Sequence, residues 1–248
     1  MLDNGAAPAH ERSRMSLLIL VRHGQASITG DDYDLLSPLG EHQAGVTGRA
    51  LGERMAQPAV IVRGSLRRHG QTASGITAAS GWSCPVETDD RWDEFDHDGL
   101  LAAAHPEYAT RPALLEALAA QENPARAFQD LFLASVDRWT GGEHDGDYRE
   151  SFPTFVRRVR EAATELAERP GTAVVSSSGG PIAVLAALST LGTNDAGPEV
   201  AKAWGRLNEV AVNGAVSKFL RGRRPTPTLL SYNDHSHFEH DRDLISYR

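Results

Sequence analysis

Hydrophobic positions along the chain fall into short continuous runs and into longer stretches of helical periodicity. Residues 17–21 are apolar without interruption and stop at Arg22, which predicts a strand buried on both faces. Other short runs, rich in β-branched residues, predict further strands at residues 59–62, 86–88, 172–176, 209–220 and 228–232. The run at 209–220 is interrupted at Asn213-Gly214.

Segments with helical spacing of apolar residues lie between these runs. Ser37 and Pro38 have the residue types of an N-cap and a first helical position, so a helix is expected to begin there. Ser151 precedes a strong apolar stripe that predicts a helix as far as Arg169. Other helices are expected to end near Ala79 and to cover residues 112–121, 124–139, 182–191 and 198–207.

Alternation of strands and helices predicts an α/β fold, a three-layer α-β-α sandwich with a mainly parallel central sheet. From about residue 96 to 150 this alternation stops, and we interpret the block as a helical cap insertion over the strand ends. Residues 1–15 are polar and are expected to form a flexible tail, so that residues 16–248 make one domain with its cap. Met15 directly precedes the first strand and is an alternative start of translation to Met1.

The overall charge narrows the classes of partner. The 248 residues carry a formal net charge of −8, with a pI of about 5.7, so binding to nucleic acid or to an anionic membrane is not expected. A single cysteine, Cys84, permits no intramolecular disulfide, which fits a cytoplasmic protein. The apolar run before Arg22 is too short to span a membrane and has no signal-peptide cleavage site.

Polar residues with catalytic potential follow three of the predicted strands. Arg22 and His23 follow the first strand, Arg68 follows the second, and Ser178 and Gly179 follow the strand at residues 172–176. Because ligands bind at the carboxyl ends of strands in open α/β sheets, these residues are expected to meet if their strands are neighbours. Arg67 is expected to lie on a helix surface. Residues 221–225 are expected to form a basic turn whose arginines, Arg221, Arg223 and Arg224, are solvated.

These residue types suit chemistry on a phosphate group. Arginine supplies planar bidentate donors for a phosphate dianion, so Arg22 and Arg68 are candidates to bind it. A neutral imidazole at His23 can attack phosphorus. Glu94 is a candidate proton donor, provided that apolar neighbours raise its pKa, whereas Asp93 and Asp96 are expected to be solvated or to cap loops. No residues suggest a metal site or a bound cofactor.

Five motifs together resemble those of the histidine phosphatase superfamily, the phosphoglycerate-mutase-like family. Arg22-His23-Gly24 resembles its signature tripeptide, and residues 36–44 resemble its conserved helix start. Residues 64–73 resemble the segment with the phosphate-binding arginine, which the register assigns to Arg68. Residues 92–95 resemble the segment with the proton donor, and residues 233–238 resemble a C-terminal motif.

The resemblance implies roles for individual residues. His23 is the expected nucleophile, Glu94 the acid, and Arg22 and Arg68 the phosphate clamp. Gln25, Ser178 and Gly179 are expected to contact the substrate, a small phosphorylated molecule or a phosphoprotein. The acidic block at 96–150 matches the variable cap of the family and is expected to select the substrate.

Three positions depart from the family pattern. Ser178 stands where the family's late motif has its second catalytic histidine, His69 replaces an alanine, and Gly64 replaces a serine. A hydroxyl cannot carry the charge of an imidazolium, and losing one preorganised donor costs about 3–4 kcal/mol in the transition state. His69, His235 and His237 are candidates to compensate, although each is expected to have a structural or surface role. We expect Ser178→His to raise activity.

The sequence therefore predicts a phosphatase that hydrolyses a phosphomonoester through a phosphohistidine at His23. One alternative is a phosphatase-like protein that binds a phospho-ligand with little or no turnover. A second is a phosphoglycerate-mutase-type phosphotransferase, which is disfavoured because mutase chemistry relies on both histidines. A third is a serine hydrolase built on Ser178, although Ser176 stands where the nucleophile elbow requires glycine. The physiological substrate and the oligomeric state stay open.

Overall fold

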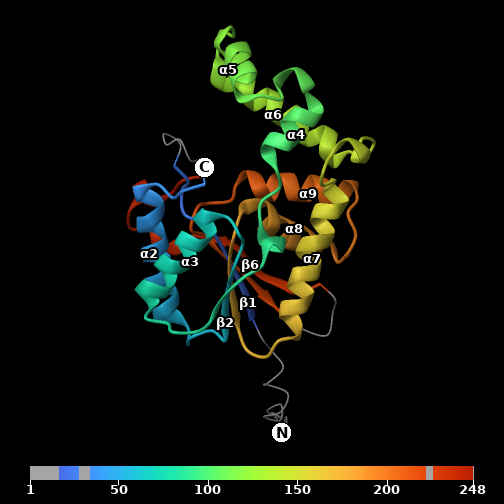
Figure 1. The fold of residues 1–248 in the computed structure, drawn as a ribbon. Helices are drawn as coiled ribbons and strands as arrows, with labels where there is room; N and C mark the ends of the chain where they lie inside the picture. The colour runs from blue at the N-terminus through green and yellow to red at the C-terminus, as the bar shows by residue number, and fades with distance from the viewer. Residues whose placement is uncertain (1–16, 28–33, 222–225, 248) are drawn as a thin grey trace. The chain divides into compact units, whose positions relative to one another are not determined.

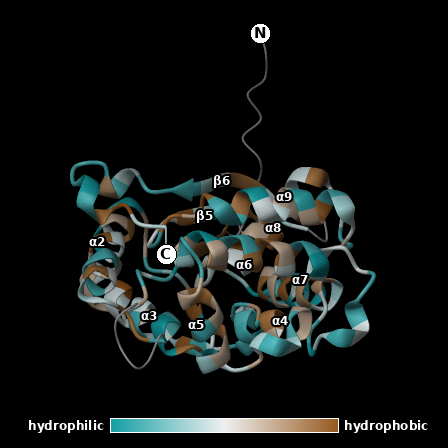
Figure 2. Cartoon of the chain, turned by 90° about the horizontal axis from the view of Figure 1, so that it is seen from above, coloured by the Kyte–Doolittle hydropathy of each residue, from teal (hydrophilic) through white to brown (hydrophobic). Residues whose placement is uncertain are grey.

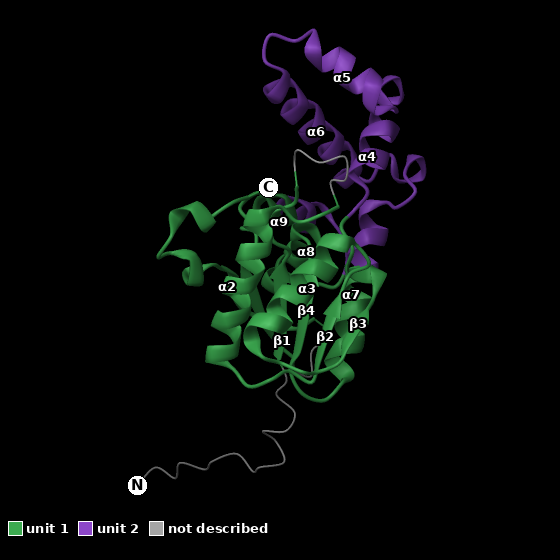
Figure 3. Cartoon of the chain, turned by 60° about the vertical axis from the view of Figure 1, so that its left-hand side comes forward, with its two compact units in different colours: residues 1–94, 159–194, 203–248 green, residues 95–158, 195–202 purple. Residues whose placement is uncertain are grey.

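The computed structural model describes residues 17–27, 34–221 and 226–247. The chain divides into two compact units, of which unit 1 comprises residues 1–94, 159–194 and 203–248 (Figure 3). Unit 2 comprises residues 95–158 and 195–202. The expected tail at 1–15, including Met15, lies outside the described residues, as do Arg223 and Arg224 of the predicted basic turn.

Unit 1 is built on a sheet whose six described strands have the order β3-β2-β4-β1-β5-β6 (Figure 1). The first four of these pair in parallel, and β5 and β6 pair antiparallel, so the expectation of a mainly parallel sheet is confirmed. The strands are β1 (Leu17–Arg22), β2 (Val60–Arg63), β3 (Val86–Thr88), β4 (Ala173–Ser177), β5 (Val216–Leu220) and β6 (Thr228–Asp234).

The register brings the carboxyl ends of three strands to one level. Arg22 at the end of β1 pairs with Ser177 of β4, and Arg63 at the end of β2 pairs with Ser176. Because β4 lies between β1 and β2, the polar residues that follow all three strands emerge side by side. This is the arrangement that the sequence predicts on the condition that the strands are neighbours.

Helices cover both faces of this sheet, which gives the three layers (Figure 1). One face carries α2 (Pro38–Arg54) and α3 (Arg67–Ser80), and the other carries α8 (Gly179–Leu191). Further helices of the chain are α7 (Phe152–Glu168) and α9 (Pro198–Glu209). Hydrophilic and hydrophobic segments alternate along α2, as its one buried face requires (Figure 2). Ser37 caps α2 as predicted, with Oγ accepting from the Gly40 N–H at 3.1 Å.

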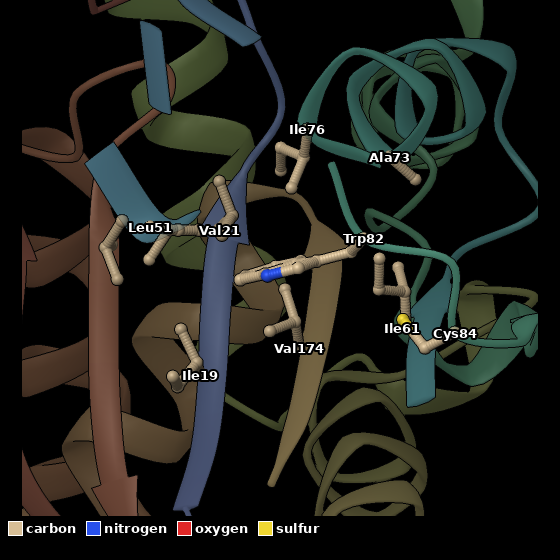
Figure 4. Close-up of a cluster of buried hydrophobic side chains, with 10 residues drawn as sticks. Ile19, Val21, Leu51, Ile61, Ala73, Ile76, Trp82, Cys84 and Val174 are labelled. Atoms are coloured by element: carbon tan, nitrogen blue, oxygen red, sulfur yellow. The ribbon is translucent and has the colours of Figure 1, made fainter. Parts of the chain in front are cut away.

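Apolar side chains from strands and helices pack together within unit 1. Ile19 and Val174 lie in neighbouring strands, and Ile76 of α3 and the ring of Trp82 pack against the same cluster (Figure 4). Burying each such side chain contributes about 1.5–3 kcal/mol. A smaller cluster contains Phe238 and Leu244 near the C-terminus. These clusters fix the strand ends against which the polar residues are held.

Among the described residues, three α-helices lie wholly within unit 2, namely α4 (His97–Ala104), α5 (Arg111–Ala119) and α6 (Pro124–Thr140). The helices α5 and α6 follow the predicted ranges, while α4 is absent from the sequence-based expectation because two helical turns are too short to establish a period. Within the unit, the rings of Phe95 and Trp139 stack with centroids 4.9 Å apart. Asp96 caps α4 by accepting from the Gly99 N–H.

Three sequence-based expectations require correction. The helix expected from residue 182 begins at Gly179, so that the two glycines belong to its first turn. Residues 209–215 are not a strand, because α9 ends at Glu209 and Gly214 has a left-handed φ of +73°. Arg221, expected to be solvated, is 3% exposed and donates to the carbonyl oxygens of Arg169 and Gly171.

Along residues 17–27, 34–221 and 226–247, none of the helices combines the length and the apolar composition that crossing a bilayer requires.

Candidate active site

The segment that follows β1 is fixed by backbone hydrogen bonds from several elements. The His23 N–H donates to Ser177 O at 2.8 Å, and the Gly24 N–H donates to the Thr72 hydroxyl of α3 at 3.1 Å. The Gln25 N–H donates to Gln43 Oε1 of α2 at 2.8 Å. A Cβ on Gly24 would lie 2.2 Å from the Gly40 carbonyl oxygen, so only glycine fits there.

The His23 imidazole is buried, and one of its nitrogens has a defined partner. Nδ1 lies 2.7 Å from the Gly24 carbonyl oxygen, which can only accept a hydrogen bond. This assigns the hydrogen to Nδ1 and leaves the lone pair on Nε2. Burial, followed by the charges of Arg68 and Arg22 and the neighbouring His69, lowers the pKa of His23 well below its usual value, against the effect of the carbonyl bond. The ring is therefore neutral at neutral pH.

Arg68 is the buried member of the arginine pair at the start of α3. Its side chain is 10% exposed, whereas Arg67 is exposed, as the sequence predicts. Arg68 Nη1 donates to Asp34 Oδ1 at 2.8 Å, and the Arg67 N–H donates to Asp34 Oδ2 at 2.8 Å. One carboxylate thus holds the first turn of α3 and orients the buried guanidinium.

Arg22 passes beside the first turn of α8. Its Nη1 donates to the carbonyl oxygens of Ala211 and, at 3.1 Å, Tyr247. Its Nε lies 3.5 Å from the position that a Cβ on Gly179 would take. The structure therefore brings Arg22 and Gly179 together, as expected for residues that follow neighbouring strands; their role in binding an anion stays a prediction.

Glu94 lies at the same helix terminus. Its Oε2 accepts from the Gly180 N–H of α8 at 3.2 Å. The chain just before it is anchored by Ser177, whose hydroxyl donates to the carbonyl oxygen of the fully buried Trp92 at 2.6 Å. Glu94 is thus held against the helix whose N-cap is Ser178.

Gln25 is engaged with the start of α2. Its Oε1 accepts from the Ser37 hydroxyl at 2.9 Å, while Gln43 bonds its backbone N–H. The side chain of Gln25 therefore supports the loop geometry. A role for it in substrate binding stays a prediction.

A second imidazole lies close to His23. The His69 ring centroid is 5.7 Å from that of His23, and His69 Nε2 lies 2.7 Å from Ser178 Oγ. His69 Nδ1 lies 3.4 Å from Asp93 Oδ1. Burial lowers the pKa of His69. The contact with Asp93 raises this pKa, whereas the charge of Arg68 lowers it further.

Sequence reasoning missed this arrangement because it treated His69 and Asp93 separately. His69 is completely buried, and Asp93 accepts from the backbone N–H groups of Ser65 and Leu66 and from the Ser65 hydroxyl. Asp93 therefore caps a turn and also faces the imidazole. One feature of the sequence could have predicted the contact: residues 64, 69 and 178 all depart from the motifs that the rest of the chain follows.

His235 and His237 have the structural roles expected for them. His237 Nε2 lies 3.1 Å from the Thr47 hydroxyl and 3.2 Å from the Gly214 carbonyl oxygen. Burial lowers its pKa to about 4, although the Gly214 bond acts in the opposite direction. His235 Nδ1 lies 2.7 Å from the carbonyl oxygen of Asn233. These contacts hold the C-terminal segment against α2 and the turn before β5.

The sequence matches one family over most of its length. The histidine phosphatase superfamily (branch 1) matches residues 18–214. No curated protein matches the sequence.

Solved structures with a similar fold include two phosphatases and a mutase. Mycobacterial glucosyl-3-phosphoglycerate phosphatase complexed with VO3 is 25% identical, with a TM-score of 0.55 over 88% of this chain and 99% of that chain. A mutant phosphoserine phosphatase from Entamoeba histolytica, in complex with phosphoserine, is 19% identical, with a TM-score of 0.58 over 90% and 99%. Phosphoglycerate mutase from Bacillus anthracis is 16% identical, with a TM-score of 0.59 over 91% and 96%.

Proposed function

Because the chain belongs to the histidine phosphatase superfamily, we propose that it is a phosphatase that hydrolyses a phosphomonoester through a phosphohistidine at His23. The observation that carries the proposal is the state of this imidazole. It is buried and neutral, with Nδ1 committed to the Gly24 carbonyl and the charges of Arg22 and Arg68 close enough to lower its pKa. A neutral imidazole with its lone pair on Nε2 is a competent nucleophile for phosphorus.

In the first step, His23 Nε2 attacks phosphorus and the bond to the leaving oxygen breaks. Arg22 and Arg68 hold the phosphoryl oxygens with bidentate donors and balance their charge. Glu94 donates a proton to the departing alkoxide, which leaves as an alcohol. The location of Glu94 at the N-terminus of α8, beside Ser178, supports this role.

In the second step, water attacks the same phosphorus and the P–N bond breaks. Glu94, now a carboxylate, takes a proton from this water, and inorganic phosphate departs. His23 recovers its lone pair, and the backbone N–H of Gly179 and the Ser178 hydroxyl complete the oxyanion environment. The cycle requires no redox group and returns every residue to its starting state.

The names of the structural neighbours suggest where to begin the search for a substrate. Two of them are phosphatases for small metabolites, glucosyl-3-phosphoglycerate and phosphoserine. We propose that the substrate is likewise a small phosphorylated molecule. A panel of these compounds, sugar phosphates, nucleotides and a phosphopeptide tests this class.

The direct test measures release of phosphate from an aryl phosphate. His23→Ala is expected to lower turnover by about 10³-fold or more because the nucleophile is lost. The matched control is His235→Ala, which removes a histidine held by Asn233 and should leave the rate unchanged. Equal turnover in wild type and His23→Ala would exclude His23 as the nucleophile.

A protein that binds phospho-ligands with little turnover is the second candidate, and Ser178 in place of a histidine favours it. Acid-quenched reactions with labelled substrate distinguish the two. A phosphatase accumulates label on His23 and releases phosphate, whereas a binding protein does neither. Isomerisation of a phosphoglycerate without phosphate release would instead identify a mutase-type phosphotransferase.

A further inference from the structure

Asp93, His69 and Ser178 form a continuous chain of polar contacts beside the nucleophile, which we call the relay. Ser178 Oγ lies 2.7 Å from His69 Nε2, and His69 Nδ1 lies 3.4 Å from Asp93 Oδ1. His69 and Ser178 are both fully buried. Ser178 is the N-cap residue of α8, and within the described part of the chain its hydroxyl makes no capping bond to that helix. The hydroxyl is directed to His69 instead.

The backbone next to the relay is shaped to admit the imidazole. A Cβ on Gly64 would lie 2.2 Å from His69 Nδ1 and 2.4 Å from Asp93 Oδ1, so any side chain there would displace both groups. The His69 backbone is fixed as well, because Ser176 Oγ donates to its carbonyl oxygen at 2.9 Å. The three unusual residues 64, 69 and 178 therefore meet at one place.

When no anion is bound, the protonation states of Asp93 and His69 determine which group donates each hydrogen bond in the relay. Asp93 is a carboxylate whose pKa is lowered by His69 and Ser65 in spite of its partial burial, so it can only accept. We therefore assign the His69 hydrogen to Nδ1, which faces Asp93 Oδ1 at 3.4 Å. Burial and the charge of Arg68 keep His69 neutral, so Nε2 carries a lone pair. The Ser178 hydroxyl must then donate to His69 and cannot donate elsewhere.

We propose that the relay reverses when a phosphoryl group binds: His69 takes up a proton from solvent at Nε2 and stays cationic, its Nε2–H donates a hydrogen bond to Ser178 Oγ, and the Ser178 hydroxyl turns to donate to a phosphoryl oxygen. This inference rests on the proposed function, because it assumes an anion beside His23. His69 is then a positioning residue that acts through Ser178. The relay supplies a cationic donor system at a site where serine alone would be neutral.

The charges around His69 favour the reversal only when an anion is present. Arg68 from α3 and the neighbouring His23 face His69, while Asp93 and Glu94 contribute negative charge. Two charges added by a bound dianion outweigh the repulsion from Arg68 and stabilise the imidazolium. Binding of a dianion and protonation of His69 are therefore coupled, and the coupling is reciprocal.

The experiment is calorimetric titration of the intact protein with sulfate near neutral pH, in buffers with different ionisation enthalpies. Sulfate keeps both charges near neutral pH, so any proton exchanged belongs to the protein. Wild type is expected to take up about one proton per sulfate bound. His69→Gln and Ser178→Ala should bind sulfate with little proton uptake, while the control His235→Ala should match wild type.

Each outcome separates the two proposals. Sulfate binding without proton uptake in wild type overturns the relay and leaves the phosphatase proposal intact, whereas absence of sulfate binding removes the anion site on which both depend. Uptake that persists in His69→Gln but disappears in His23→Ala would place the proton on His23 and overturn the relay. Labelling of Ser178 by a fluorophosphonate would also overturn it, by identifying Ser178 as a nucleophile.

Circular dichroism and thermal melting establish that each variant is folded. Ser178→Ala removes only the side-chain oxygen of an N-cap residue, and within the described residues this oxygen makes no capping bond to α8. This variant is therefore expected to fold and can test the relay even if His69→Gln does not fold.

Discussion

At the scale of single residues, the site differs from its family in where one imidazole is attached. The motifs place a histidine at position 178, whereas this chain has serine there and carries the ring at position 69 of α3. His69 nevertheless lies beside His23, with 5.7 Å between ring centroids. Gly64 provides the space that the moved ring requires. The three departures thus meet at one place beside His23, as an exchange of the two positions would require.

For Ser178→His the structure leads to the opposite prediction from the one that the sequence supports. A histidine at 178 would compete with His69 for the same buried space, so we expect the single variant to lose about 10²–10³-fold in kcat. The triple variant Gly64→Ser, His69→Ala and Ser178→His restores the pattern of the family and should recover at least about tenfold of that loss. Steady-state kinetics on an aryl phosphate measures both rates. A single variant faster than wild type would contradict the exchange.

At the scale of elements, the loop after β1 and the start of α2 touch through their backbones. A Cβ on Gly40 would lie 2.2 Å from the Gln25 carbonyl oxygen, just as a Cβ on Gly24 would collide with Gly40. Both glycines occur in motifs that can be recognised in the sequence. Why both positions require glycine is visible only in the structure. The contact joins two segments through their backbones, so it leaves no hydrophobic pattern in the sequence.

Substitution at two glycines of α2 tests this contact. Gly40→Ala is expected to lower the free energy of unfolding by about 1–3 kcal/mol, because the backbones must separate. Gly45→Ala in the same helix should raise it by about 0.4–1 kcal/mol, because the contact found for its Cβ among the described residues is with Arg49 Nη1, at an ordinary distance of 3.9 Å. Urea denaturation compares them. A similar effect of both variants would show that helix propensity, and not the backbone contact, controls stability at position 40.

At the scale of the whole molecule, the sequence predicts the sheet better than the site. The apolar runs identify β1, β2 and β4, and their parallel pairing follows from the helices between them. The polar ends meet because β4, more than 100 residues after β2, inserts between β2 and β1, an order that no local pattern encodes. The relay likewise depends on three distant segments. Residue types are enough to predict Arg22, His23, Arg68 and Glu94 as site residues. The contact of His69 with Ser178 could not be predicted, because it forms only in the tertiary structure.

Buried histidines also give the whole molecule a pH dependence. The pKa values of His23 and His69 are lowered mainly by burial, and that of His237 is lowered to about 4 for the same reason. Above about pH 6.5 these side chains are neutral in the folded and unfolded states. As the pH falls below that value, only the unfolded chain takes up protons, so stability is lost progressively toward the folded-state pKa values.

We expect the free energy of unfolding in urea to be lower at about pH 5 than at about pH 7.5, a range in which unfolded carboxyl groups are still largely ionised. His237→Gln should show a smaller loss over that range, because it removes one of the three groups. Equal stability of wild type at both pH values would contradict the neutral, buried state of these histidines.

The C-terminal residues also set the order in which the molecule can be completed. Gln43 Nε2 donates to Leu244 O and Ser246 Oγ, and Arg22 donates to Tyr247 O. Two early segments of the chain therefore complete their hydrogen bonds only when the C-terminal segment is present. Arg22 precedes its partner Tyr247 by 225 residues, so β1 and its arginine are made long before this partner is available. The nascent chain can therefore bury much of its core before Arg22 reaches its final position. The segment that follows β1 is therefore among the first parts translated and among the last to gain all of its contacts.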